Sequence, residues 1–91
     1  MSLKKVSVVQ LAREFVYDTS YPVGTEVIVE VGSKCYFGIV VDEVESVNFE
    51  VKPVICAVGR IPLELVKAVK DTAVVYKTTP AAIFKKFSSY R

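Results

Sequence analysis

The side chains that most often carry out catalysis are scarce in this chain and do not stand at catalytic spacings. There is no histidine among the 91 residues, so a Ser-His-Asp or Cys-His nucleophile of the common kind is absent. None of the four glycines fits a nucleotide-binding loop, because Gly32 before Ser33-Lys34 has no glycine five residues upstream. The adjacent carboxylates Asp42 and Glu43 point to opposite sides of a predicted strand. We therefore expect a binding module without catalytic residues.

The two cysteines do not form a metal-binding motif. Cys35 and Cys56 are isolated, and with no CxxC pair and no histidine the chain lacks the usual zinc ligands. Both lie in apolar strand-like patterns, which predicts that they are buried small apolar side chains. The sequence contains no signal-peptide pattern and no apolar run of membrane-spanning length. We therefore expect a cytoplasmic protein that holds no metal and no cofactor in this fragment and does not contact a membrane.

The elements that must position any binding residues are mainly β-strands. Valine, a residue that favours strands, is the commonest residue in the chain. Residues 25–31 alternate between valines and mixed side chains, and Gly32-Ser33-Lys34 then turns the chain into a second strand. Gly38 within that second strand indicates a bulge or a close contact. The predicted strands span residues 5–11, 14–18, 25–31, 35–44 and 51–58, and Pro53 places its part of the last one at an edge or a strand end.

The hydrophobic period becomes helical in the last third of the chain. Pro62 suits a first helical turn, and apolar residues recur at helical spacing as far as Tyr76, which predicts a helix over 62–76. Thr79 and Pro80 predict the N-cap and first turn of a second helix. Three apolar residues form its predicted buried face: Ile83, Phe84 and Phe87. We expect a single α+β domain over residues 1–91, with a small, mostly antiparallel, barrel-like sheet of five or six strands and two C-terminal helices packed on one side.

The net charge of +2 conceals an uneven distribution. Residues 1–59 carry five basic and eight acidic residues, giving −3, and residues 60–91 carry seven basic and two acidic residues, giving +5. A basic C-terminal third suits contact with a polyanion, and it equally suits an ordinary solvated helical surface. Charge alone leaves both interpretations open.

A specific order of residues covers almost the whole chain from about Val6 onward. It begins with an arginine and two aromatics spaced by one residue, and it continues through a Pro-x-Gly turn, a VxV strand, a glycine, a Gly-Ile-Val strand and a lysine. The positions are Arg13, Phe15, Tyr17, Pro22, Gly24, Gly32, Gly38, Ile39, Val40 and Lys52, followed by Tyr76 and Pro80. In this order the chain resembles the N-terminal 3′ DNA-binding domain of the PriA family, the replication-restart helicases also called primosomal protein N′.

The resemblance implies a domain that binds the 3′ end of the nascent leading strand at a stalled, forked DNA. In that family the pocket is made by an aromatic-acid-aromatic segment, the glycine after the following strand, and a lysine ahead of the fifth strand. The matching positions here are Phe15, Val16, Tyr17, Gly32 and Lys52. An aromatic ring can stack on a terminal base without reading its identity, a bare glycine backbone lets the sugar approach, and a lysine can meet a phosphate.

The resemblance also implies what lies outside this fragment. The full-length protein would be an ATP-dependent 3′-5′ DNA helicase whose motor and zinc-binding cysteines follow Arg91. ATP and zinc would belong to that region, and other primosome proteins would bind through the full-length protein.

Val16 departs from the family pattern, because it stands where the family commonly has an acid. On a strand Val16 and Asp18 share a face, so we hypothesise that Asp18 supplies the carboxylate that accepts a hydrogen bond from the terminal hydroxyl or base. The same residues also have structural interpretations. Phe15 and Tyr17 are equally typical of a core, Gly32 is typical of a plain hairpin turn, and Lys52 is equally typical of an ordinary surface lysine.

Two further functions are compatible with the sequence. The chain can be a small β-barrel protein-interaction module whose basic helices contact an acidic partner, or it can bind single-stranded DNA without regard to its ends. Blocking or removing a recessed 3′ end separates these functions from 3′-end recognition, because only the latter requires a free terminus. Salt dependence does not separate them, since salt weakens every electrostatic contact of this kind.

Overall fold

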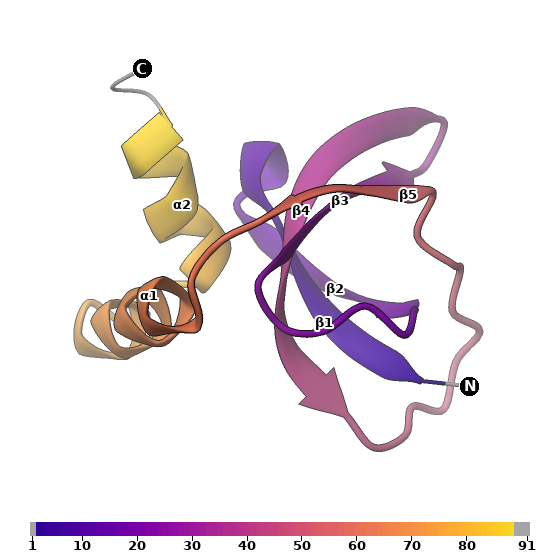
Figure 1. Cartoon of the computed structure of the whole chain (residues 1–91), viewed down its shortest axis with the longest axis horizontal. Helices are drawn as coiled ribbons and strands as arrows, with labels where there is room; N and C mark the ends of the chain where they lie inside the picture. Colours follow the sequence, from indigo (N-terminus) through magenta and orange to yellow (C-terminus); the bar gives the residue numbers. More distant parts are fainter. Residues whose placement is uncertain (1, 89–91) are drawn as a thin grey trace.

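The computed structural model describes residues 2–88, which form a five-stranded antiparallel sheet and two helices (Figure 1). The strands are β1 (Leu3–Val8), β2 (Arg13–Asp18), β3 (Thr25–Val31), β4 (Lys34–Val44) and β5 (Cys56–Arg60), and their order across the sheet is β2-β1-β4-β3-β5. Helices α1 (Leu63–Val75) and α2 (Pro80–Ser88) lie together on one side of the curved sheet. The predicted α+β class is confirmed, with five strands and a sheet that does not close into a barrel.

The first and fifth predicted strands differ most from the observed bounds, while β2 and β4 each begin one residue earlier than predicted. β1 ends at Val8, because residues 9–11 form a 3-10 turn that ends at Ala12, whose φ of +52° lies in the left-handed region. The fifth strand spans Cys56–Arg60 and not residues 51–58. Pro53 has no N–H for a ladder and makes only an isolated parallel bridge to Asp18. Residues 45–55 therefore form a loop that crosses to the far edge of the sheet before β5 begins.

The predicted hairpin between β3 and β4 is present, with a turn one residue shorter than the predicted Gly32-Ser33-Lys34. Val31 pairs with Lys34, so Gly32 and Ser33 are the two loop residues. Gly32 has a φ of +64°, whereas Ser33 does not have a positive φ, which is the pattern of a type II′ turn. The turn itself thus requires the backbone freedom of glycine at position 32.

The face of the sheet opposite the helices carries an apolar cluster, called here the inner core. Its buried members are Val6, Val8, Tyr17, Val27, Val29 and Val40, and Phe15, Val31 and Tyr36 are among the half-buried residues packed against them. The alternation seen in the sequence of β3 places its three valines, at 27, 29 and 31, on this face. The inner core therefore holds together β1, β2, β3 and β4.

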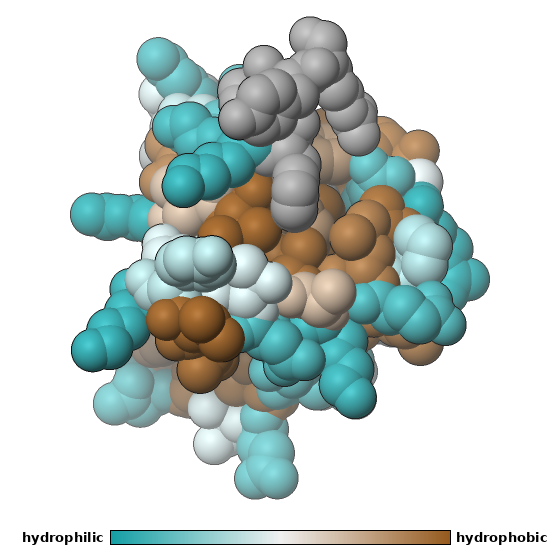
Figure 2. Space-filling model, turned by 90° about the vertical axis from the view of Figure 1, so that its left-hand side faces the viewer, coloured by the Kyte–Doolittle hydropathy of each residue, from teal (hydrophilic) through white to brown (hydrophobic). Residues whose placement is uncertain are grey.

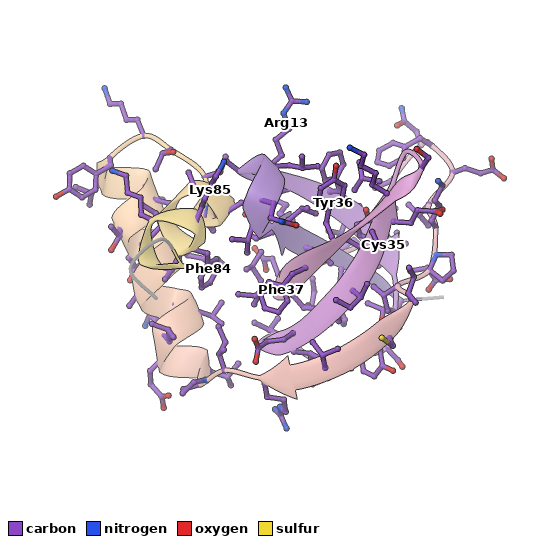
Figure 3. The ribbon with its side chains drawn as sticks, turned by 90° about the horizontal axis from the view of Figure 1, so that it is seen from above. Arg13, Cys35, Tyr36, Phe37, Phe84 and Lys85 are labelled. Carbon is purple, nitrogen blue, oxygen red and sulfur yellow. The ribbon has the colours of Figure 1, made fainter. Side chains whose placement is uncertain are left out.

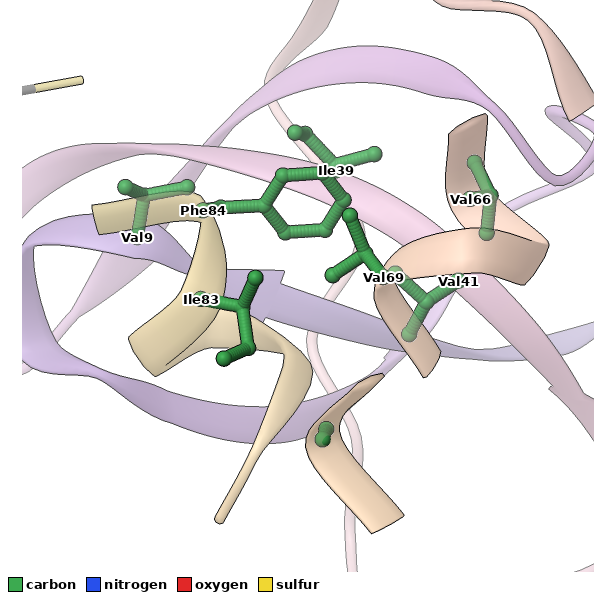
Figure 4. Close-up of a cluster of buried hydrophobic side chains, with 8 residues drawn as sticks. Val9, Ile39, Val41, Val66, Val69, Ile83 and Phe84 are labelled. Atoms are coloured by element: carbon green, nitrogen blue, oxygen red, sulfur yellow. The ribbon is translucent and has the colours of Figure 1, made fainter. Parts of the chain in front are cut away.

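A second apolar cluster fills the space between the sheet and the helices (Figure 4). The ring of Phe84 lies beside Ile39, so α2 packs directly on β4. The cluster consists of Val9, Ile39, Val41, Val66, Val69, Ala73, Ile83 and Phe84. The predicted burial of Ile83 and Phe84 is confirmed, while the side chain of Phe87 lies outside the described part.

β4 supplies both clusters because its side chains alternate between the two faces: Ile39 and Val41 join the helical side, and Val40 joins the inner core. Lys5 pairs with Asp42 but Val6 pairs with Val40, so Val41 is the extra residue of a bulge. Gly38 makes the predicted close contact, because a Cβ there would lie 2.6 Å from Val6 Cγ1.

Helix α2 is fastened to the turn before β2. The Thr79 hydroxyl accepts a hydrogen bond from the Ala82 N–H at 3.2 Å, which confirms Thr79 as the N-cap. It also donates to the carbonyl of Ala12 at 3.0 Å, and Lys85 Nζ donates to the carbonyl of Gln10 at 3.1 Å. The start of β2 is therefore held against α2.

The carboxylates of Asp42 and Glu43 are on opposite sides of β4, as predicted. Glu43 pairs with Lys4 at 2.6 Å, and Asp42 pairs with Lys70 of α1 at 3.1 Å. Burial by itself raises the pKa of Asp42, but hydrogen bonds from Lys70 and the Glu43 N–H, together with the charges of Lys70 and Lys5, lower it below its ordinary value. Both carboxylates therefore form ion pairs within the fold.

The prediction that both cysteines are buried is wrong. Cys35 and Cys56 are exposed free thiols. Cys35 pairs with Glu30 and Cys56 with Ile28, the residues that β3 directs away from the inner core, and no helix covers them there. Within residues 2–88, neither helix is long and apolar enough to cross a membrane.

Candidate functional site

A depression of about 370 Å³ opens between the outer edge of β2 and the tip of the β3–β4 hairpin, and we call it the rim pocket. Three segments that are far apart in the sequence line it. They are residues 14–17 of β2, residues 30–32 at the end of β3 and residues 49–52 of the loop before β5. No described residue of either helix contributes to this lining.

Two backbone hydrogen bonds bring the loop to the pocket. The N–H of Asp18 donates to the carbonyl of Lys52 at 2.9 Å, and the N–H of Ile55 donates to the carbonyl of Ile28 at 2.8 Å. The loop therefore bridges from the edge strand β2 to β3, between which the sheet is open. This crossing places residues 49–52 over the gap.

Five of the six predicted site residues line the rim pocket. They are Phe15, Val16, Tyr17, Gly32 and Lys52. Asp18 does not line it, because its Oδ1 lies 3.3 Å from the backbone N–H of Ser2, and its own backbone is occupied by the bond to Lys52. The structure thus gathers the segment of β2, the hairpin glycine and the lysine, but not the carboxylate that was expected to replace the family acid.

Tyr17 is a core residue that reaches the pocket only at its edge. It is 4% exposed and belongs to the inner core, and its hydroxyl donates to the carbonyl of Glu30 at 3.0 Å. Burial, and secondarily the negative charge of Glu30, raises the pKa of Tyr17 above 10.0. Phe15 is half-buried and packs against the same core while lining the pocket. Phe15 and Tyr17 therefore both pack in the core and line the pocket.

Phe49 is a pocket residue that the sequence analysis missed. It lies in the loop and is 59% exposed. The signal for it was present, because a phenylalanine within the polar stretch 45–50 fits no strand or helix pattern and has no core face to join. Its position over the gap depends on the path of the loop, which no periodicity reveals.

The charges at the rim pocket are predominantly negative. The lining includes three acidic residues, Glu14, Glu30 and Glu50, and one basic residue, Lys52. Glu14 accepts a hydrogen bond from the Ser7 hydroxyl at 2.9 Å, and Glu30 lies 3.6 Å from Lys52 Nζ. The Glu30–Lys52 ion pair is about half exposed, so it contributes only about 0–1 kcal/mol to the stability of the fold. A ligand can therefore displace either partner at little cost. The pocket thus offers acceptors for hydroxyl and amino groups beside one cation.

Gly32 borders open space. A Cβ at this position would meet no atom within 4 Å, so an incoming group can approach its backbone. The positive φ required by the turn is a sufficient structural reason for glycine here. The exposure of Gly32 at the pocket is therefore an addition to its role in the hairpin.

Two basic side chains flank the pocket along its walls. Arg13 precedes Glu14 in β2 and projects into solvent (Figure 3), and Lys34 pairs with Val31 across the hairpin. Neither makes an ion pair within the described part of the chain. They are available to phosphates outside the pocket.

The helical side of the molecule has a different character. Figure 2 shows apolar areas on this side among hydrophilic side chains. The exposed large apolar residues of this part of the chain are Leu63, Leu65, Val74, Val75 and Tyr76. Part of the basic charge is used within the fold, since Lys70 pairs with Asp42 and Lys85 bonds to Gln10.

No group of three or more acidic, cysteine or histidine side chains in residues 2–88 is arranged to hold a metal ion. No protein-family model matches the chain, and no curated protein or solved structure is significantly similar to it. The geometry of the rim pocket is therefore the main structural guide to function.

Proposed function

We propose that this chain is a DNA-binding domain whose rim pocket takes the 3′ terminus of a DNA strand. The observation that carries the proposal is the convergence of Phe15, Val16, Tyr17, Gly32 and Lys52 on one pocket from three separate segments. These are the positions at which the chain resembles the 3′-end pocket of the PriA family. The aromatic wall suits a base, the open backbone at Gly32 suits a sugar, and Lys52 suits a phosphate.

The charges favour a terminus over an internal nucleotide. Three carboxylates in the lining repel phosphates but accept hydrogen bonds from a sugar hydroxyl. A 3′-terminal nucleotide presents such a hydroxyl, and its single 5′-phosphate can lie toward Lys52. The phosphates further along the strand would then meet Arg13 and Lys34 outside the pocket.

The biological setting we propose follows from the same resemblance. The chain would act within a cytoplasmic primosomal replication-restart helicase, recognising the nascent leading strand at a stalled fork. In this proposal the ATP-dependent motor, its zinc site and the contacts with other primosome proteins belong to regions outside these 91 residues.

A forked duplex with a recessed 3′ end tests the proposal. We expect the chain to bind the fork with a free 3′-hydroxyl, and to lose most of that affinity when the recessed strand is removed or its 3′ end is blocked. Equal binding to all three forks would instead identify an end-blind binder.

One observation favours a second candidate, a protein-interaction module that uses the helices. Val74, Val75 and Tyr76 are 78%, 74% and 73% exposed at the end of α1, beside several lysines. Exposed apolar residues rimmed by charge are typical of protein-binding surfaces. Under this candidate, charge reversal at Lys67 and Lys77 weakens binding of an acidic partner, and the forked DNA is not bound.

A further inference from the structure

Phe49 stands out among the aromatic residues of the rim pocket by its exposure. It is 59% exposed, whereas Tyr17 is 4% exposed and Phe15 is half-buried. Tyr17 is a buried member of the inner core, and its hydroxyl is bonded to the carbonyl of Glu30. Tyr17 therefore has no free ring face to offer a ligand without opening the core.

The surroundings of Phe49 leave its ring accessible. It lines the rim pocket and also a neighbouring depression of about 690 Å³, which is bounded by Leu3 and residues 45–51. With 59% of its surface exposed beside these depressions, Phe49 has surface free for contact. Such a ring can take a planar partner without displacing a core residue.

The loop holds Phe49 at a defined place. Three residues after it, the carbonyl of Lys52 accepts the hydrogen bond from the Asp18 N–H, and Pro53 then bridges to Asp18. Phe49 and Lys52 thus project from one anchored segment of loop into one pocket. An aromatic ring and an ammonium group in one pocket suit the base and the phosphate of a single nucleotide.

We propose that Phe49, and not Tyr17, is the platform on which the terminal nucleobase stacks. This inference rests on the proposed function and assigns the base to a residue outside the segments that the resemblance identified. Stacking on a phenyl ring does not read hydrogen-bonding edges, so all four bases are accepted. In this arrangement Phe15 lines the pocket, and Tyr17 supports it from the inner core.

The test couples a substitution in the protein with one in the DNA. Binding is measured by fluorescence anisotropy for a fork with a normal 3′-terminal nucleotide and for the same fork with an abasic 3′-terminal sugar. The variants are Phe49→Ala, Phe49→Leu, Phe49→Tyr, and Tyr76→Ala as a control that removes a more exposed aromatic outside the lining. Circular dichroism melting verifies that each variant is folded.

Stacking is worth roughly a 5- to 100-fold change in affinity for an alanine substitution. We expect Phe49→Ala and Phe49→Leu to weaken binding of the normal fork by that factor, Phe49→Tyr and Tyr76→Ala to leave it unchanged, and all variants to bind the abasic fork like the unsubstituted chain. An equal loss on both forks, or no loss from Phe49→Ala, overturns the assignment. If the unsubstituted chain itself ignores the 3′ end, the proposed function fails and this inference fails with it.

Discussion

The hydroxyl of Tyr17 donates a hydrogen bond to the backbone carbonyl of Glu30 at 3.0 Å, and it thereby ties the edge strand β2 to the end of β3. These two strands are not neighbours in the sheet, since β1 and β4 lie between them. The bond therefore joins two of the three segments that line the rim pocket. Tyr17 thus defines the pocket while remaining part of the inner core.

Replacing Tyr17 by Phe removes this bond and keeps the ring. We expect the free energy of unfolding at pH 7 to fall by about 0.5–1.5 kcal/mol, the usual net contribution of a hydrogen bond. Because burial and the charge of Glu30 raise the pKa of Tyr17, its contribution is complete below about pH 10 and is lost as the pH rises through the folded-state pKa. Urea unfolding at pH 7 and above pH 10 should therefore show the difference between the two proteins shrinking at high pH. A difference independent of pH would contradict this account, and Tyr76→Phe serves as the exposed control.

The carboxylate that accepts the terminal hydroxyl is expected to be Glu30, because it lines the pocket and lies 3.6 Å from Lys52 Nζ. Asp18 does not line the pocket, and Glu14 is bonded to the Ser7 hydroxyl. Glu30→Gln removes the negative charge and releases Lys52, so discrimination between 3′-hydroxyl and 3′-phosphate ends should fall about tenfold, the value of one charge-assisted hydrogen bond. Asp18→Ala should leave discrimination unchanged. Glu50→Gln removes an equal charge from the same lining without touching Lys52. If Glu50→Gln acts as strongly as Glu30→Gln, net charge and not Glu30 sets the preference.

Gly38 is required by packing and not by backbone conformation. A Cβ would lie 2.6 Å from Cγ1 of the fully buried Val6, so Gly38→Ala should destabilise the fold by about 1–3 kcal/mol through overpacking. Gly59 provides a matched control, because its added Cβ would also meet an atom at 2.6 Å, but that atom is the end of the flexible Glu26 side chain. Thermal unfolding should show a clearly smaller loss for Gly59→Ala. Adding Val6→Ala to Gly38→Ala should recover part of the loss if the contact is its cause.

The ion pair between Asp42 and Lys70 joins the sheet to α1. The pKa of Asp42 is lowered, so its stabilising effect is present above its ordinary pKa of 3.8 and is lost as the pH falls through the folded-state value. Because the carboxylate is 50% exposed, we expect Asp42→Asn to cost only about 0–1 kcal/mol at pH 6. The free energies of unfolding of the unsubstituted chain and Asp42→Asn, measured from pH 6 to pH 2, should become equal at the acidic end. In a chain that already carries Lys70→Met, Asp42→Asn should lower the free energy of unfolding much less. A stability difference that stays constant at all pH values would exclude the ion pair as its cause.

The hairpin and both helices could be predicted from the sequence, because alternation, helical spacing and turn residues are local signals. The six site residues came from the family resemblance and the Asp18 hypothesis, and five of them line the rim pocket. The register shift at Val41 and the exposure of Cys35 and Cys56 depend on which faces the helices cover, and this is decided by packing. The fifth strand was placed too early, since Pro53 bonds to the far strand instead of pairing with β3. Phe49 and Glu30 could be identified as pocket residues only once the path of the loop was known. The backbone hydrogen bonds of Lys52 and Ile55 determine that path.

Photocrosslinking from the DNA terminus tests most directly whether the rim pocket holds the 3′ end. A fork carrying 4-thiothymidine as its 3′-terminal nucleotide is irradiated with the chain, and the crosslinked peptides are mapped by mass spectrometry. We predict crosslinks within residues 14–17 and 49–52, and their loss when the thymidine analogue is moved well inside the strand. Crosslinks confined to α1 and α2, or an unchanged pattern with the internal analogue, would contradict the account.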